Sequence, residues 1–140
     1  MVTNQDTLKK MTNAIDKSLK EISVLIKSYK DGSPTSLECQ GEYLGLNKIK
    51  KQVLDIENKA IDKNSIDIKA FYKLEHEIIS EIINRKPVKE TSYNKGYYMG
   101  LDHGRNFVNA LIIAEIKREE GQKNNICQNI NEQTRKGILR

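Results

Sequence analysis

Residues 96–105 read GYYMGLDHGR and place glycines at Gly96, Gly100 and Gly104, at every fourth position. In an α-helix this spacing puts all three on one side. A glycine inside a helix costs about 0.8–1.0 kcal/mol relative to alanine. A row of them therefore needs a compensating contact, and bare backbone lets another helix approach closely. We predict that this stretch belongs to a long helix whose glycine side makes a close contact with another part of the chain, a partner or a ligand.

The stretch has an earlier counterpart in the chain. Residues 41–50 read GEYLGLNKIK, so that Gly41 and Gly45 align with Gly96 and Gly100. One tyrosine and one leucine are also identical between the two copies, and several other pairs are chemically alike. Each copy follows a loop with capping residues, after a long amphipathic segment. We interpret this as an internal duplication of a helix-loop-helix unit.

Apolar residues recur at spacings of three and four along four segments, as expected for amphipathic helices. The segments cover about residues 7–30, 35–59, 66–85 and 92–119. Only two prolines and eight glycines interrupt the chain of 140 residues, which favours long helices. The predicted fold class is all-α, with four helices in two consecutive helix-loop-helix units. In the fourth segment the predicted apolar surface comprises Tyr97, Leu101, Phe107, Val108, Leu111, Ile112, Ile113, Ala114 and Ile116.

The boundaries of these segments carry start and stop signals. Gly32 suits the position just after the first helix, and Pro34 follows as a breaker. Thr35 and Glu38 have the spacing of a capping box, which predicts the start of the second helix. We expect one domain over residues 1–119, made of unit 4–61 and unit 64–119. Residues 120–140 are rich in Gln, Asn, Lys and Glu and are predicted to form a flexible or partly helical tail.

Composition and charge restrict the class of protein. The 24 Lys and Arg exceed the 19 Asp and Glu, giving a formal charge of +5 that mildly favours anionic partners. No apolar run approaches the roughly 18–20 residues that span a bilayer, and the start of the chain does not resemble a signal peptide. Cys39 and Cys127 form neither a disulfide framework nor a zinc motif. We expect a cytoplasmic protein with no membrane contact, no metal and no cofactor.

The glycine face has three alternative interpretations. It is either a crossing between two helices of one chain, a contact with a partner or a second copy in a homodimer, or a place where a ligand lies against bare backbone. All three depend on the same set of small residues: Gly41, Gly45, Gly96, Gly100 and Gly104.

Beside the glycines, each copy carries an aromatic residue, a polar residue and a cation on one helix face. This combination resembles a small recognition patch for a phosphate or an acidic partner. The alternative is that the tyrosines pack while Asp102 and Arg105 form an ordinary pair within the helix. The patch residues are Tyr43, Asn47 and Lys50 in the first copy, and Tyr98, Asp102 and Arg105 in the second.

The first segment is the best candidate for contact with nucleic acid. Its lysines lie opposite the apolar stripe, where they could neutralise phosphates without reading sequence. Asp6, Asp16 and Glu21 share this side and weaken the case. The residues predicted for such a contact are Lys10, Lys17, Lys20 and Lys27.

No motif in the sequence carries a recognisable catalytic chemistry. Our leading hypothesis is therefore a non-enzymatic interaction protein that binds a larger protein or nucleoprotein assembly through the glycine-tyrosine face. Its Lys-, Asn- and Ile-rich composition suits a small accessory factor or inhibitor of the kind encoded by a phage or mobile element. The alternative is a nucleic-acid-binding accessory protein that uses the lysine side of the first helix.

Overall fold

The computed structural model describes the backbone of residues 4–60, 65–85 and 91–138, and side chains over 6–60, 65–85 and 91–121. This part of the chain contains helices and no strand, so the predicted all-α class with four helices is confirmed. The helices are α1 (Asn4–Ser28), α2 (Pro34–Lys59), α3 (Ile68–Ile83) and α4 (Ser92–Ile138).

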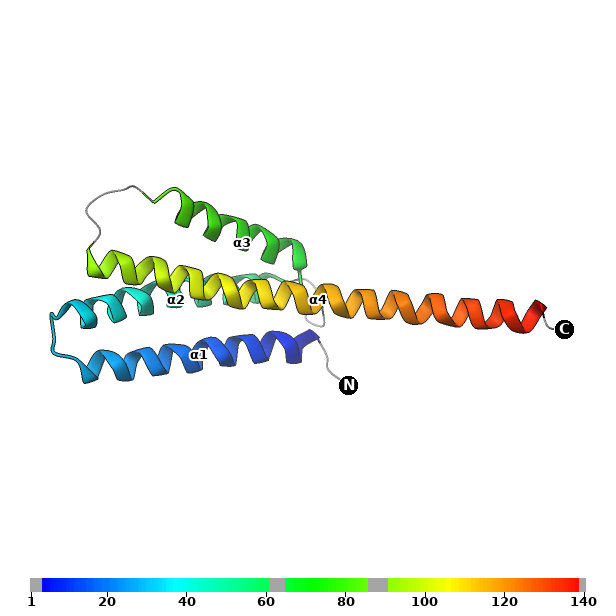
Figure 1. Cartoon of the computed structure of the whole chain (residues 1–140), viewed down its shortest axis with the longest axis horizontal. Coiled ribbons are helices and arrows are strands. Elements are labelled where there is room, and N and C mark those ends of the chain that lie inside the picture. Colours follow the sequence, from blue (N-terminus) through cyan, green and yellow to red (C-terminus); the bar gives the residue numbers. More distant parts are fainter. Residues whose placement is uncertain (1–3, 61–64, 86–90, 139–140) are drawn as a thin grey trace.

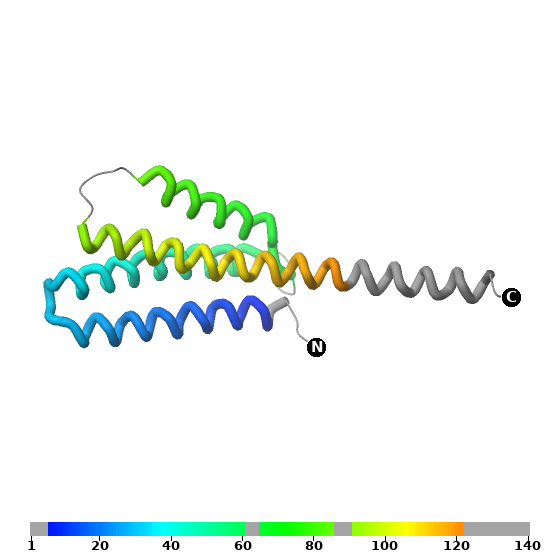
Figure 2. The backbone as a smooth tube through the Cα atoms, viewed as in Figure 1, coloured from blue at the N-terminus to red at the C-terminus, as the bar shows by residue number. Residues whose placement is uncertain are grey.

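The helices α2 and α4 form the centre of the molecule (Figure 1). They run side by side in the same direction and make the most extensive contact between any two helices. The helices α1 and α3 run in the opposite direction and lie on either side of this pair. The hairpin of α1 and α2 can be followed from blue to cyan in Figure 2. Two hairpins therefore meet through their second helices.

The turn between α1 and α2 differs from its prediction. Gly32 has a φ of 78° and lies in a four-residue turn, which the N–H of Ser33 closes by donating to the carbonyl of Lys30 at 3.1 Å. Ser33 caps α2, because its hydroxyl accepts a hydrogen bond from the N–H of Ser36 at 3.2 Å. The predicted capping box at Thr35 is therefore wrong. Pro34 does not only break the first helix; its fixed φ and missing donor suit the first turn of the second.

Side-chain caps also start the helices of the second hairpin. Asp67 caps α3, accepting from the N–H of Ala70 at 3.2 Å, and the hydroxyl of Thr91 accepts from the N–H of Asn94 at 3.1 Å before α4. The predicted end of the fourth helix at Glu119 is wrong, because α4 continues to Ile138. No proline follows Glu119, and Gln, Lys and Glu are good helix formers. The flexibility of residues 120–140 remains a prediction.

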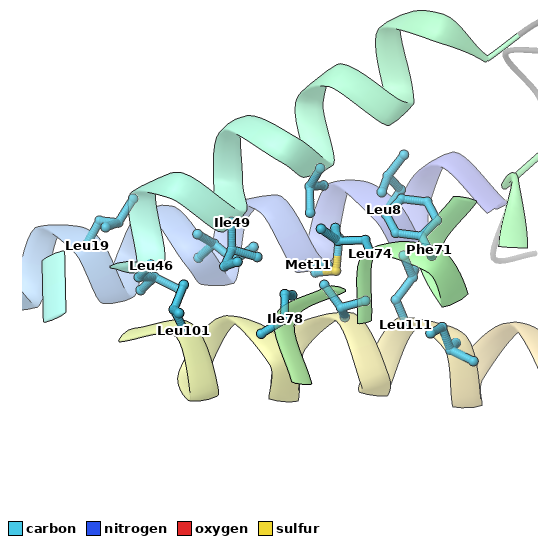
Figure 3. Packing of buried hydrophobic residues seen from close by; sticks show 14 of the residues in the cluster. Leu8, Met11, Leu19, Leu46, Ile49, Phe71, Leu74, Ile78, Leu101 and Leu111 are labelled. Atoms are coloured by element: carbon cyan, nitrogen blue, oxygen red, sulfur yellow. The ribbon is translucent and has the colours of Figure 1, made fainter. Parts of the chain in front are cut away.

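The core is aliphatic and is built from all four helices. Figure 3 shows labelled side chains from each helix pointing toward one another, with Phe71 as the one aromatic among the fully buried residues of the described chain. Burying a side chain of this kind contributes about 1.5–3 kcal/mol. Ile113 and Ala114 are exposed, contrary to the predicted stripe, because they lie on the outer side of α4. The buried apolar residues are Leu8, Met11, Ile15, Leu19, Ile22, Leu46, Ile49, Val53, Phe71, Leu74, Ile78, Leu101, Val108, Leu111 and Ile112.

Candidate functional site

The glycines singled out in the sequence lie between α2 and α4, and we call them the glycine seam: Gly41, Gly45, Gly96, Gly100 and Gly104. A Cβ on Gly41 would collide with the carbonyl oxygen of Tyr93 and come within 2.8 Å of the nitrogen of Tyr97. A Cβ on Gly104 would stand 2.6 Å from the Cγ1 of Ile49. Four of the five glycines thus face backbone of the opposite helix, and Gly104 faces a core side chain.

The contacts along the seam are reciprocal. Gly45 faces the carbonyl of Tyr97 and the nitrogen of Leu101. Gly100 faces the carbonyl of Glu42 and the nitrogen of Leu46. The repeat alignment that pairs Gly45 with Gly100 also pairs the atoms that each of them faces. The two central helices therefore face each other through equivalent positions of the alignment.

This arrangement selects among the three interpretations of the glycine face. The backbone of α4 covers the glycines of α2, and the backbone of α2 covers those of α4. All five glycines are buried. Neither a partner nor a ligand has room on this surface while the chain is folded as described.

A polar cluster that the sequence did not reveal lies on one side of the seam and joins three helices. Tyr97 of α4 donates its hydroxyl proton to Oε1 of Glu81 on α3, at 2.8 Å. Lys48 of α2 donates to Oε2 of the same carboxylate at 3.0 Å and to the Tyr97 hydroxyl at 3.1 Å. The cluster ties α3 to the central pair of helices.

Burial and hydrogen bonding act against each other on the pKa values of this cluster. Burial alone would raise the pKa of Glu81, but hydrogen bonds from Tyr97 and Lys48 outweigh it and lower that pKa. For Lys48, burial alone would lower the pKa, and its hydrogen bonds to Tyr97 and Glu81 leave the pKa raised. Burial raises the pKa of Tyr97. At neutral pH the cluster therefore holds a carboxylate, an ammonium and a protonated phenol.

The opposite side of the seam carries the counterpart of this cluster. The same repeat alignment pairs Lys48 with His103 and Glu42 with Tyr97. The Nδ1 of His103 lies 3.7 Å from Oε1 of Glu42, and its ring stacks on Phe107 with 5.0 Å between centroids. A polar contact thus joins α2 and α4 on each side of the seam: an ammonium and a phenol on one side, and an imidazole and a carboxylate on the other.

The two predicted recognition patches lie on different helices, and their cations are already paired. Lys50 forms an ion pair with Asp16 of α1. Arg105 pairs with Asp102, through Nη2 at 2.9 Å and Nε at 3.0 Å. The structure does not bring the two patches together into one site, and each cation has an acidic partner inside the chain.

The tyrosines of these patches differ in their surroundings. Tyr43 is exposed, whereas Tyr98 is half-buried with the guanidinium of Arg85 at 5.4 Å from its ring centroid. Tyr98 also meets Tyr97 edge to face, at 5.4 Å between centroids. Asn47 of the first patch is half-buried.

Large exposed apolar side chains gather at one end of the bundle. Among the described residues, eight of eleven come from the ends of α1 and α3 or from the first three turns of α2 and α4, near the α1–α2 turn in Figure 1. The other three of this group are Leu54, Tyr72 and Ile113. We call the following eight residues the apolar end: Val24, Leu25, Tyr29, Tyr43, Leu44, Ile83, Tyr93 and Met99.

The predicted lysines of the first helix, Lys10, Lys17, Lys20 and Lys27, lie on α1 and are exposed, as is Lys9. No ion pair or side-chain hydrogen bond engages these five ammonium groups within the described residues. They form a separate surface from the glycine seam.

Sequence reasoning missed Lys48, Glu81 and Glu42, because their partners lie far away along the chain. The alignment of the two copies contained one usable signal. Lys48 and Tyr97, which meet across α2 and α4, align with His103 and Glu42, which also meet across these helices. Within the described part of the chain, no three His, Cys, Asp or Glu side chains are grouped as a metal site would require. None of the described helices is long and apolar enough to cross a membrane. Comparison with protein-family models, curated proteins and solved structures finds no match for this chain.

Proposed function

We propose that this chain is a non-enzymatic helical protein that binds a larger protein or nucleoprotein assembly through its apolar end. The proposal depends on one observation, the gathering of eight of the eleven large exposed apolar side chains in the described chain at that end. Large apolar side chains that are exposed together at one end of a protein commonly contribute to an interaction site. A role as accessory factor or inhibitor remains part of the proposal.

The chemistry of the apolar end fits a protein partner. Three of its members, Tyr29, Tyr43 and Tyr93, are tyrosines. Tyrosine is enriched at protein interfaces, because its ring buries much area at a small entropic cost and its hydroxyl still forms a hydrogen bond. The glycine seam, which the sequence suggested as the contact surface, instead serves to hold the central helices together.

The chain offers a matched pair of variants to test this proposal. Leu44→Glu combined with Met99→Glu places two charges in the apolar end, at side chains that are 47% and 43% exposed. Leu54→Glu combined with Ile113→Glu makes the same change on the same two helices, away from the apolar end, at 36% and 42% exposure. Both variants should fold, because all four side chains already face solvent.

The measurement is affinity purification with quantitative mass spectrometry, with and without nuclease. We expect the unaltered chain and the Leu54/Ile113 variant to retain the same partner protein after nuclease treatment. The Leu44/Met99 variant should lose at least nine-tenths of it, since buried charge at the centre of an interface costs several kcal/mol. Equal recovery by both variants, or recovery of nothing except RNA, would refute the proposal.

A further inference from the structure

The outer side of α1 carries a lysine face that shares no residue with the apolar end, although its last member, Lys27, lies beside Val24, Leu25 and Tyr29 in the sequence. Successive residues of a helix advance by about 100°. On this basis the five lysines fall within an arc of about 100°, opposite the buried residues of the same helix. The lysine face is defined by these exposed residues: Lys9, Lys10, Lys17, Lys20 and Lys27.

The structure changes the balance of charge that the sequence suggested for this helix. Asp16 points toward α2, where it is paired with Lys50, so it does not neutralise the lysine face. Asp6 lies at the start of the face and Glu21 at its edge. Five lysines against these two acids leave an excess of three positive charges. The face therefore complements an anionic surface along its whole length.

The length and the type of cation fit a nucleic-acid backbone. The distance from Lys9 to Lys27 corresponds to about 27 Å along a helix. This span matches about eight base-pair steps of a duplex. Lysine is a flexible point charge without the planar fork by which arginine recognises guanine, so contacts of this kind do not read sequence.

Two other anionic partners fit the face less well. A helix that inserts into a membrane surface needs an apolar side, and the apolar side of α1 is buried in the core through residues such as Ile15 and Ile22. Proteins that bind single strands stack bases on aromatic side chains. Residues 9–27 contain no aromatic residue.

We propose that the lysine face of α1 binds the phosphate backbone of double-stranded nucleic acid without sequence preference. The exposed ammonium groups replace cations condensed on the duplex, and the released ions supply the free energy of binding. This surface uses no residue of the Leu44/Met99 variant, so its failure and the failure of the proposed function are distinguishable.

The test compares two variants that lose the same charge. Lys10→Gln, Lys17→Gln and Lys27→Gln remove three charges from the lysine face. Lys51→Gln, Lys69→Gln and Lys73→Gln remove three from exposed positions of α2 and α3. Glutamine and lysine have similar helix propensities, so circular dichroism should show both variants folded. Fluorescence anisotropy then measures binding to two 20-base-pair duplexes of unrelated sequence between 50 and 200 mM salt.

The unaltered chain should bind both duplexes equally, more tightly than a single strand of the same length or a vesicle with anionic lipid. The lysine-face variant should lose at least tenfold in affinity at 50 mM salt. The slope of log affinity against log salt should fall by about 2.7, since each phosphate contact contributes about 0.9. The affinity of the variant with substitutions on α2 and α3 should change by less than twofold. Equal losses in both variants, no binding at 50 mM salt, or equal or tighter binding to the single strand or vesicle would overturn the proposal.

Discussion

Gly45 of α2 and Gly100 of α4 lie against each other at the centre of the molecule, and a Cβ on Gly45 would come within 3.2 Å of the Cα of Gly100. Such an approach is open only to residues without a side chain. It determines the spacing of the two central helices, and through them the positions of α1 and α3. The free-energy cost of placing glycines within these helices is thus offset by the close packing of α2 and α4 that they permit.

Gly100→Ala should destabilise the protein strongly. The added Cβ would collide with the carbonyl oxygen of Glu42 and stand 2.8 Å from the nitrogen of Leu46, and these are backbone atoms that cannot move alone. Separating α2 from α4 would loosen the core, at a cost of about 3 kcal/mol or more. The measurement is the free energy of unfolding in urea.

Gly121→Ala is the control for this substitution. Gly121 also lies within α4, but nothing stands within 4 Å of its added Cβ. Only the helix propensity changes, so the free energy of unfolding should stay the same or rise by up to about 1 kcal/mol. If the two alanine variants had similar stability, the close contact at Gly100 would not exist.

Gly104→Ala should be partly repaired by a second substitution. Its Cβ would meet the side chain of Ile49, at 2.6 Å from Cγ1, and no backbone atom of α2 is among its three nearest atoms. Ile49→Ala removes Cγ1 and Cγ2, two of the three atoms that the new Cβ would meet, and alone costs about 2–5 kcal/mol. A double-mutant cycle should give a favourable coupling of about 1 kcal/mol or more between the two. Additive losses would show that residues 104 and 49 do not touch.

Glu81→Gln should reduce stability at neutral pH and have a smaller effect in acid. The pKa of Glu81 is lowered in the fold, so its contribution is present above the usual value of 4.5 and is lost as pH falls through the folded pKa. Because the ion pair with Lys48 is 42% and 37% exposed, we expect a loss of no more than about 1 kcal/mol at pH 7. The free energies of unfolding of the unaltered protein and the Glu81→Gln variant, measured in urea between pH 7 and pH 3, should converge as the pH falls.

The exposed Glu119→Gln on α4 removes one carboxylate without touching the cluster and serves as the control. The free energy of unfolding of this variant should stay close to that of the unaltered protein across the same pH range. If Glu81→Gln lowered the free energy of unfolding by the same amount from pH 7 to pH 3, the stabilising effect of the cluster would not depend on the charge of Glu81.

Local pattern was enough to predict most of the fold. The spacing of Leu101, Val108 and Leu111 placed one side of α4 in the core, where the structure has it. The spacing of Gly96 and Gly100 predicted a close contact but could not identify the partner. The missing information was the parallel pairing of α2 and α4, which depends on how whole hairpins associate.

The side-chain partners across helices could not be predicted in the same way. Asp16 and Lys50 lie on different helices, far apart along the chain, and nothing in either local sequence indicates that they meet. Their pairing nevertheless changed the interpretation of two surfaces. It occupies the cation of the first recognition patch, and it removes an acid from the lysine face.

The start of α2 shows a local competition that the sequence left undecided. Thr35 with Glu38 and Ser33 with Pro34 are both acceptable helix starts. The turn at Gly32 favours the earlier one, because Ser33 is already held by its hydrogen bond to Lys30.

Nuclear Overhauser effects measure directly whether α2 and α4 are pressed together within one chain. We expect strong effects between the Hα protons of Gly45 and Gly100, and between Hα of Gly100 and the amide proton of Leu46. In a mixture of labelled and unlabelled protein, they should arise within single molecules. If these effects were missing, or arose only between molecules, the glycine seam would not join two helices of the same chain.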